Sequence, residues 1–302
     1  MEWQERITRE TPPAIRVEHD LRYRLAASIA RGAPTWLDLG CGVGLAAADA
    51  LDGEGPARAV LVDADPDALV EAARAVPADE AVPVVADLAS DDGLAAVREA
   101  LADARDGVAT CFEVIEHLER FTGVVELLVE LVEERRFTVL LSVPNDAFWP
   151  VESPWHATMW GEGSFEELRR LLPADHVVAR QVPLQGSAIV LDGEEVPAPG
   201  QIAAFGEPVP APGQIAAFGE PVPSHFIVAF GPRTAALAPS AAVAQADLAA
   251  QRRWERTREA NLAFYEERIR WAQREFSEWR DYMNELEGEL GREPTKTPLD
   301  FP

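Results

Sequence analysis

The chain has 302 residues and a formal net charge of −25 at pH 7, with 27 basic and 52 acidic side chains. Because duplex nucleic acid requires a field of lysine and arginine, this charge argues against a nucleic-acid partner. Two cysteines are too few for a disulfide framework, and no apolar run approaches the ~20 residues that span a bilayer. We therefore expect a cytoplasmic protein without a membrane span, built as one α/β domain with additions.

The first predicted elements surround a glycine-rich turn. Apolar residues at helical spacing predict a helix over residues 14–31, and a short strand follows that ends in the sequence DLGCGVG at residues 38–44. The glycines are typical of a turn between a strand and a helix, where the backbone passes close to a ligand or packs tightly. A carboxylate inside the turn disfavours a phosphate. The sequence therefore indicates a cationic or amine-bearing ligand.

Further strands and helices alternate along the chain. Apolar runs predict strands at residues 59–62, 82–86, 108–112 and 137–143, with helices between them. This alternation is typical of βαβ units in a parallel sheet with right-handed crossovers. Acidic residues stand at the carboxyl ends of the first four strands: Asp38, Asp63, Asp87 and Glu113. Since ligands bind beyond this edge of such a sheet, we expect one acidic rim, although any single carboxylate can instead cap a helix.

The same motifs resemble those of class I S-adenosylmethionine-dependent methyltransferases, over roughly residues 14–231. The resemblance implies a Rossmann-like, doubly wound sheet of seven strands, in which a sixth strand at 177–182 is followed by an antiparallel terminal strand at 225–230. It also implies that the glycine turn faces the methionine moiety, that Asp63 holds the ribose hydroxyls, and that Asp87 bonds the adenine amine. The cofactor-binding residues predicted in this way are Asp38, Gly40, Cys41, Gly42, Gly44, Asp63, Ala64, Asp87, Leu88, Glu113 and Tyr23.

A second similarity is to methyltransferases of polysaccharide biosynthesis clusters. Residues 18–23, which read EHDLRY, resemble an element of their first helix, and residues 142–145, 153–156 and 165–168 resemble later motifs. This similarity implies O-methylation of a sugar or glycan. Two other functions stay open. One is O- or N-methylation of a small-molecule natural product, and the other is a catalytically silent subunit that binds S-adenosylmethionine.

Candidates for catalysis follow the fourth strand and recur in the segment after the fifth. His117 and His156 can each take a proton from an acceptor hydroxyl, and Glu113 stands at the same rim. Alternatively, Glu113, Glu116, His117 and His156 can ligate a divalent metal, as a similar Glu-x-x-Glu-His pattern does in some related methyltransferases. The residues alone do not decide between a general base, a metal site and structural histidines.

The segment at residues 144–163 is too irregular for a helix and too aromatic for a solvated linker. We expect it to form an aromatic wall for the acceptor, with a satellite hydrophobic cluster as the alternative. Its large side chains are Phe148, Trp149, Trp155, His156, Met159 and Trp160.

The rest of the chain consists of predicted additions. An inserted loop at 184–224 contains a perfect 13-residue tandem repeat, 198–210 and 211–223, and should leave from the rim as a lid or a neutral expansion. A linker is expected at 232–240. Within 241–290 apolar residues recur in three-four steps, which predicts a long helix that forms a coiled coil and a homo-oligomer, or that docks on the catalytic domain. Residues 291–302 form a tail.

Overall fold

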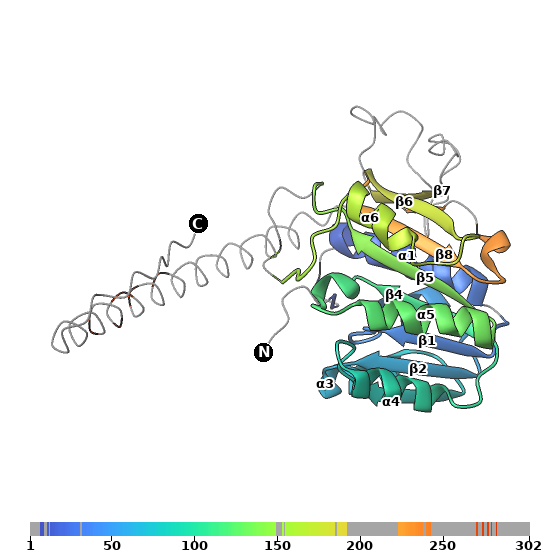
Figure 1. Ribbon diagram of the computed structural model, residues 1–302. Helices are drawn as coiled ribbons and strands as arrows, with labels where there is room; N and C mark the ends of the chain where they lie inside the picture. Colours follow the sequence, from blue (N-terminus) through green and yellow to red (C-terminus); the bar gives the residue numbers. More distant parts are fainter. Residues whose placement is uncertain are drawn as a thin grey trace. The chain divides into compact units, whose positions relative to one another are not determined.

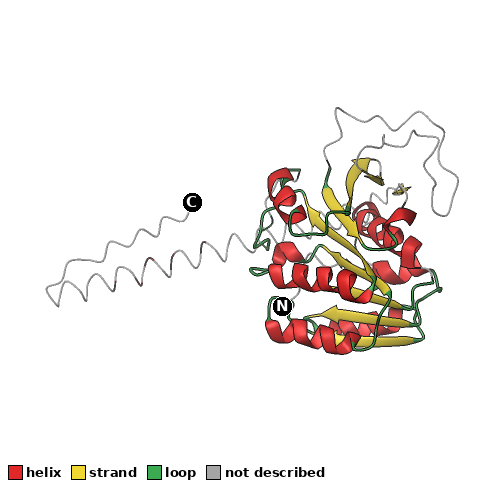
Figure 2. Ribbon diagram, turned by 45° about the vertical axis from the view of Figure 1, so that its right-hand side comes forward, coloured by secondary structure: helices red, strands yellow, loops and turns green. Residues whose placement is uncertain are grey.

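The computed structural model of the chain describes residues 7–8, 11, 13–30, 32–148, 153, 155–184, 186–191, 223–237 and 240–242, and five single residues from 270 to 282. The chain divides into two units, Met1–Asp247 and Leu248–Pro302. In the described part of the first unit, helices cover both faces of one sheet, as Figure 1 shows and the turned view of Figure 2 makes clear.

Within the described residues the sheet has nine strands, in the order β3-β2-β1-β4-β5-β8-β6-β7-β9. Five parallel strands form its first half: β1 (Thr35–Leu39), β2 (Arg58–Asp63), β3 (Glu80–Val85), β4 (Gly107–Phe112) and β5 (Phe137–Pro144). Next, β8 (His225–Phe230) lies antiparallel between β5 and β6 (Val177–Leu184). The predicted parallel sheet and its antiparallel strand are thus confirmed. The carboxyl ends of β1 to β6 share one edge, which we call the rim.

The helices divide between the two faces. One face carries α1 (Pro13–Ala30), α2 (Leu45–Leu51) and α3 (Pro66–Ala75), and the other carries α4 (Asp91–Leu101), α5 (Thr122–Arg135) and α6 (Glu162–Arg169). Successive strand residues point to opposite faces, so Leu37 packs under α4 and α5 while Trp36 packs under α1. Burial on both faces explains why these strands are almost continuously apolar.

Two strands in this sheet were not predicted. β7 (Gly186–Leu191) turns back directly from β6, with Leu184 opposite Gly186, so the segment from residue 184 begins as a hairpin and not as a loop. β9 (Ser240–Ala242) pairs with β7, and the short 3-10 helix η2 (Thr234–Ala236) precedes it. The predicted linker at 232–240 thus includes η2 and the first residue of β9. β7 pairs with β6 because an antiparallel hairpin covers the strand edge that β6 would otherwise expose.

The hairpin also changes where the insertion starts. β7 ends at Leu191, opposite Ala179 near the beginning of β6, so the chain leaves this strand at the edge of the sheet opposite to the rim. The inserted segment thus leaves β6 at the rim, and beyond Leu191 its chain continues from the opposite edge of the sheet. Residues 192–222, with all but the last residue of the tandem repeat, lie outside the described residues.

The predicted C-terminal helix lies almost entirely outside the described residues. Residues 241–242 belong to β9, and the described residues beyond them are Arg270, Arg274, Ser277, Trp279 and Tyr282, each of which is helical. The Trp279 and Tyr282 rings are exposed and their centroids are 6.3 Å apart. The coiled coil and the homo-oligomer stay predictions, as does the tail.

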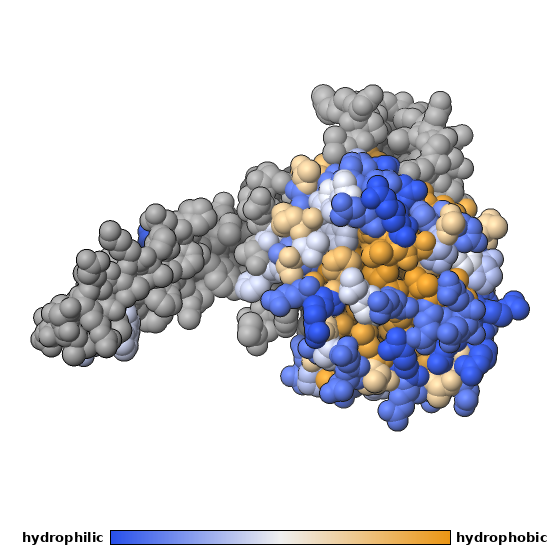
Figure 3. Space-filling model, in the orientation of Figure 1, coloured by the Kyte–Doolittle hydropathy of each residue, from blue (hydrophilic) through white to orange (hydrophobic). Residues whose placement is uncertain are grey.

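Among the described helices, none combines the length and the apolar character needed to cross a membrane. Seen as in Figure 3, hydrophilic side chains cover much of α4 and α5, while apolar side chains gather between α5 and α6.

Candidate active site

The glycine turn after β1 is bound to the end of β2. The backbone N–H groups of Gly40 and Cys41 both donate to the Val62 carbonyl, at 2.8 and 3.0 Å. Gly40 has a φ of +73°, and a Cβ at this position would fall 2.4 Å from a methyl carbon of Val114. Gly44 is constrained in the same way, by its φ of +69° and by α3. Packing within the chain therefore requires both glycines, whatever ligand the turn contacts.

Asp63, at the end of β2, holds this turn in place. Its two carboxylate oxygens accept hydrogen bonds from the backbone N–H groups of Gly42 and Asp65, each at 2.9 Å. The side chain is half-buried, and the next residue, Ala64, is exposed. Asp63 thus joins the glycine turn to the start of α3, and part of its carboxylate stays accessible at the rim.

Asp87 follows β3 and is exposed. Its carboxylate accepts a hydrogen bond from the Ala89 N–H at 2.9 Å, as in an Asx turn, while Ser90 is the residue that caps α4. Leu88 is buried among the residues packed under α4. Three successive strands therefore end in aspartates along one edge, as expected, but they differ in burial.

Asp38 is the buried member of this series, with no solvent exposure. The Tyr23 hydroxyl lies 3.1 Å from both of its carboxylate oxygens, and the Thr110 hydroxyl donates at 2.8 Å. Burial raises the pKa of Asp38 to about 7, although these two hydrogen bonds oppose the rise. In the described part of the chain its hydrogen-bond partners are neutral, so a cationic group beneath the glycine turn would compensate its charge. A buried carboxylate with neutral hydrogen-bond partners therefore suits a sulfonium or amine-bearing cofactor.

The raised pKa of Asp38 predicts a pH dependence of stability. Between about pH 4 and pH 7 the folded protein binds a proton here that the unfolded chain releases, so this group lowers the free energy of unfolding as pH rises. The total decrease is on the order of 4 kcal/mol. We expect Asp38→Asn to remove it, because asparagine is neutral and keeps a carbonyl acceptor. Denaturant unfolding at pH 5 and pH 8 measures this, and an equal decrease in the variant and the wild type would contradict it.

Glu113 follows β4, at a backbone φ of +56°. The Ser142 hydroxyl donates to one carboxylate oxygen at 2.7 Å, and His225 Nε2 lies 3.0 Å from the other. Burial would raise the pKa of Glu113, but Arg22 and His225 beside it outweigh burial and hold this pKa well below its usual range. Glu113 is therefore an ionised group bound toward β5 and β8. Sequence reasoning missed His225, because nothing local links it to β4.

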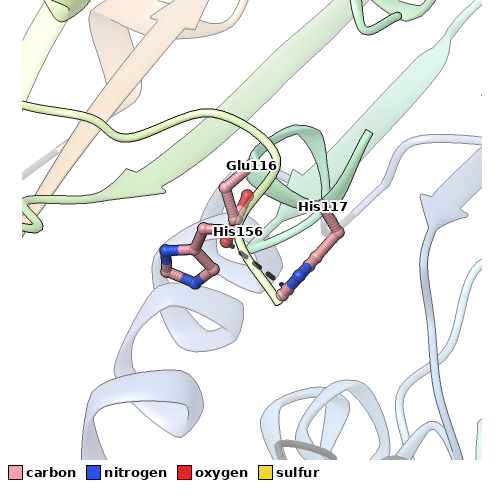
Figure 4. Close-up of side chains that lie close together, drawn as sticks. All are labelled: Glu116, His117 and His156. Carbon is pink, nitrogen blue, oxygen red and sulfur yellow. Dashed lines mark ion pairs between the residues drawn. The ribbon is translucent and has the colours of Figure 1, made fainter. Parts of the chain in front are cut away.

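A second cluster lies just beyond Glu113 and contains Glu116, His117 and His156. Glu116 and His117 belong to the 3-10 helix η1 (Ile115–His117), while His156 comes from the connection after β5 (Figure 4). One ligand atom from each of the three side chains lies within 4.8 Å of the others, and the imidazole centroids are 5.2 Å apart. The structure thus brings together three of the four predicted metal-ligating residues and holds Glu113 outside their group.

Backbone hydrogen bonds fasten the connection that carries His156. The Glu116 carbonyl accepts from the N–H groups of Ala157 and Thr158, at 2.7 and 3.1 Å. His117 Nδ1 lies 3.1 Å from the Trp155 carbonyl oxygen. The residues on both sides of His156 are therefore fixed to η1, and the position of the His156 backbone does not depend on a ligand.

Glu116 is 1% exposed, and one of its carboxylate oxygens has no hydrogen-bond partner among the described residues. Burial, and then the nearby Glu113, raise the pKa of Glu116 well above its usual range. A buried oxygen without a donor is unfavourable unless a proton or a cation compensates it. Two imidazoles and one carboxylate are ligands that several divalent metals accept, so this donor set fits such a cation.

The aromatic segment divides between the core and the surface. Trp160 is buried against Phe121, with ring centroids 5.4 Å apart, so it belongs to the hydrophobic cluster. Trp155 and Met159, on the same segment as His156, are 39% and 43% exposed, while Phe148 is half-buried. Trp149 lies outside the described residues. The hydrophobic-cluster interpretation therefore applies to Trp160, and the acceptor wall stays a prediction for the exposed residues.

The glycine turn, the acidic strand ends and the mostly parallel sheet define the Rossmann-like class of α/β proteins, whose ligands bind beyond the carboxyl ends of the strands. The sequence matches the model of a family described as a methyltransferase domain over residues 16–180, more than half of the chain. The chain belongs to this family and is an S-adenosylmethionine-dependent methyltransferase.

Solved structures similar to this chain include the small RNA methyltransferase HEN1, at 20% identity and a TM-score of 0.43, covering 72% of this chain and 26% of that one. A SAM-dependent methyltransferase from Archaeoglobus fulgidus has 15% identity and a TM-score of 0.41, covering 67% and 87%. The plantazolicin methyltransferase BpumL, in complex with SAH, has 15% identity and a TM-score of 0.38, covering 57% and 72%. The comparison with curated proteins finds no match.

Proposed function

We propose that this enzyme methylates a hydroxyl group of a sugar or glycan at the cluster of Glu116, His117 and His156. The observation that carries the proposal is the buried Glu116 oxygen without a donor, beside two imidazoles at the rim. A hydroxyl acceptor must lose its proton during transfer, so a site for O-methylation needs a base or a cation that makes the hydroxyl more acidic.

The cofactor is held by the rim of the first three strands in this proposal. Asp38 compensates the positive charge, Asp63 accepts from the ribose hydroxyls, and Asp87 accepts from the adenine amine. The cofactor supplies the activated methyl group for an in-line displacement. The chain's own part is to hold the acceptor oxygen in line with that group and to exclude other nucleophiles.

A divalent cation fits the cluster better than a single general base does. Two imidazoles and a carboxylate would hold it, and it would lower the pKa of an acceptor hydroxyl. Glu113, which was a candidate ligand and a candidate catalytic residue, instead anchors the rim through Ser142 and His225. With Glu113 ionised close by, the rim is also electrostatically favourable for a cation.

Two features support a sugar or glycan as the acceptor. Trp155 and Met159 expose apolar surface on the segment that carries His156, and an exposed aromatic ring suits the apolar face of a sugar. The net charge of −25 disfavours a polyanionic nucleic acid. An O-methyltransferase of a small-molecule natural product would use the same cluster and differ only in this surface. A catalytically silent subunit would have no need for the cluster.

The test measures transfer of a labelled methyl group from S-adenosylmethionine to a panel of oligosaccharides, small hydroxylated natural products and a short RNA. We expect transfer to a saccharide, its loss in the presence of EDTA, and its recovery when Mg²⁺ or Mn²⁺ is added. Transfer that EDTA leaves unchanged would assign the two histidines as bases instead. Transfer to RNA or to a natural product, but not to any saccharide, would overturn the acceptor class.

A further inference from the structure

We propose that Asp146 is a positioning residue that decides which ring nitrogen of His156 carries the proton, and thereby prepares the cluster for a cation. This inference rests on the proposed function. Asp146 lies in the connection just after β5 and is almost fully buried. One of its carboxylate oxygens lies 2.8 Å from His156 Nδ1, and the other accepts the N–H of Trp160.

The chemistry of the two partners sets the tautomer. An ionised carboxylate can only accept, so a neutral His156 must carry its proton on Nδ1 and its lone pair on Nε2. The same rule applies to His117, because the Trp155 carbonyl oxygen at its Nδ1 can only accept as well. Both imidazoles therefore have their lone pairs on Nε2, in a cluster whose third member is the buried Glu116 carboxyl group.

The two hydrogen bonds of Asp146 allow a variant that distinguishes a positioning role of this residue from a purely structural one. The Trp160 N–H is a donor, so an asparagine at position 146 must turn its carbonyl oxygen toward Trp160 and its amide nitrogen toward His156. The amide would then donate to Nδ1 and move the imidazole proton to Nε2. Asp146→Asn thus keeps the size of the side chain and its bond to the backbone, but removes the lone pair that a cation needs.

The experiment compares the wild type and Asp146→Asn by ¹⁵N NMR of the imidazoles and by titration with Mn²⁺ alone. We expect wild-type His117 and His156 to be protonated at Nδ1 at pH 8, and His156 of the variant to be protonated at Nε2. The affinity for Mn²⁺ should fall about 10- to 100-fold, as it does when a partner that orients a ligand is lost. The affinity for S-adenosylmethionine should not change.

Asp106→Asn is the matched control. Asp106 binds Arg233 at 2.7 and 2.8 Å, beside the start of β4 and away from the rim. We expect this control to lose some stability and to leave the tautomers and Mn²⁺ binding unchanged. In a His156→Ala background, Asp146→Asn should have no further effect on Mn²⁺ affinity.

Nδ1 unprotonated in wild-type His156 would overturn the inference even if the variant does not fold. An unchanged His156 tautomer and unchanged Mn²⁺ affinity in a folded Asp146→Asn would do so as well. The proposed function fails separately, through the absence of wild-type transfer or of its dependence on a cation, because the tautomer of His156 is measured without substrate or metal.

Discussion

Replacing His117 with alanine is expected to lower turnover by a factor of about 10² to 10⁴, the range typical of acid–base catalysis, because the cluster would lose an imidazole that holds the proposed cation and the acceptor hydroxyl would stay less acidic. The affinity for S-adenosylmethionine should stay close to that of the wild type, because His117 belongs to η1 and not to the glycine turn. His156→Ala should behave in the same way. Single-turnover kinetics and calorimetric titration with the cofactor measure the two quantities separately.

His176→Ala is the control for this prediction. His176 lies outside the cluster, with Nδ1 2.7 Å from the Pro173 carbonyl and Nε2 accepting from Arg169 at 3.0 Å. Its loss should affect stability and leave the turnover of the folded enzyme unchanged. If His117→Ala lost cofactor affinity and thermal stability in parallel with turnover, His117 would be a structural histidine and the catalytic role would be wrong.

Replacing Asp63 with alanine is expected to weaken cofactor binding by about 2 to 3 kcal/mol, or roughly 100-fold, since partners in a partly buried site lose their acceptor. Two losses are expected to contribute. The ribose hydroxyls would lose the acceptor that we propose for them, and the Gly42 N–H would lose the acceptor that fixes the glycine turn. Isothermal titration calorimetry of the folded variant measures the change.

Asp65→Ala, two residues away, is the matched control. Asp65 caps α3 by accepting from the N–H groups of Asp67 and Ala68, so its loss should cost about 1 kcal/mol of stability and little cofactor affinity. Equal cofactor affinity in Asp63→Ala and the wild type would contradict the assigned ribose contact.

Local patterns predicted most of the fold. The apolar strands and the helices between them follow from periodicity, and the glycine turn follows from conformations that other residues rarely adopt. The hairpin of β6 and β7 was missed because a short strand next to a proline-rich and glycine-rich repeat has little periodic signal. Such a strand owes its stability to its neighbour in the sheet, which only the structure reveals.

Part of the candidate site could likewise be predicted from the sequence, and part could not. The acidic strand ends could be predicted because parallel strands end along one edge. The separation of Glu113 from Glu116 could not, because it depends on Ser142 and His225, which are distant in sequence. Asp146 and Thr110 were missed for the same reason, since each acts through a side chain from another element.

The backbone bonds from Ala157 and Thr158 to the Glu116 carbonyl have an evolutionary consequence. They depend on main-chain N–H groups, so any residue except proline can occupy these two positions and leave the bonds intact. Trp155 and Met159, the exposed residues on either side, can therefore diverge under selection for a new acceptor while His156 stays where it is. A lineage with this loop can change its substrate through substitutions at the surface and keep its chemistry.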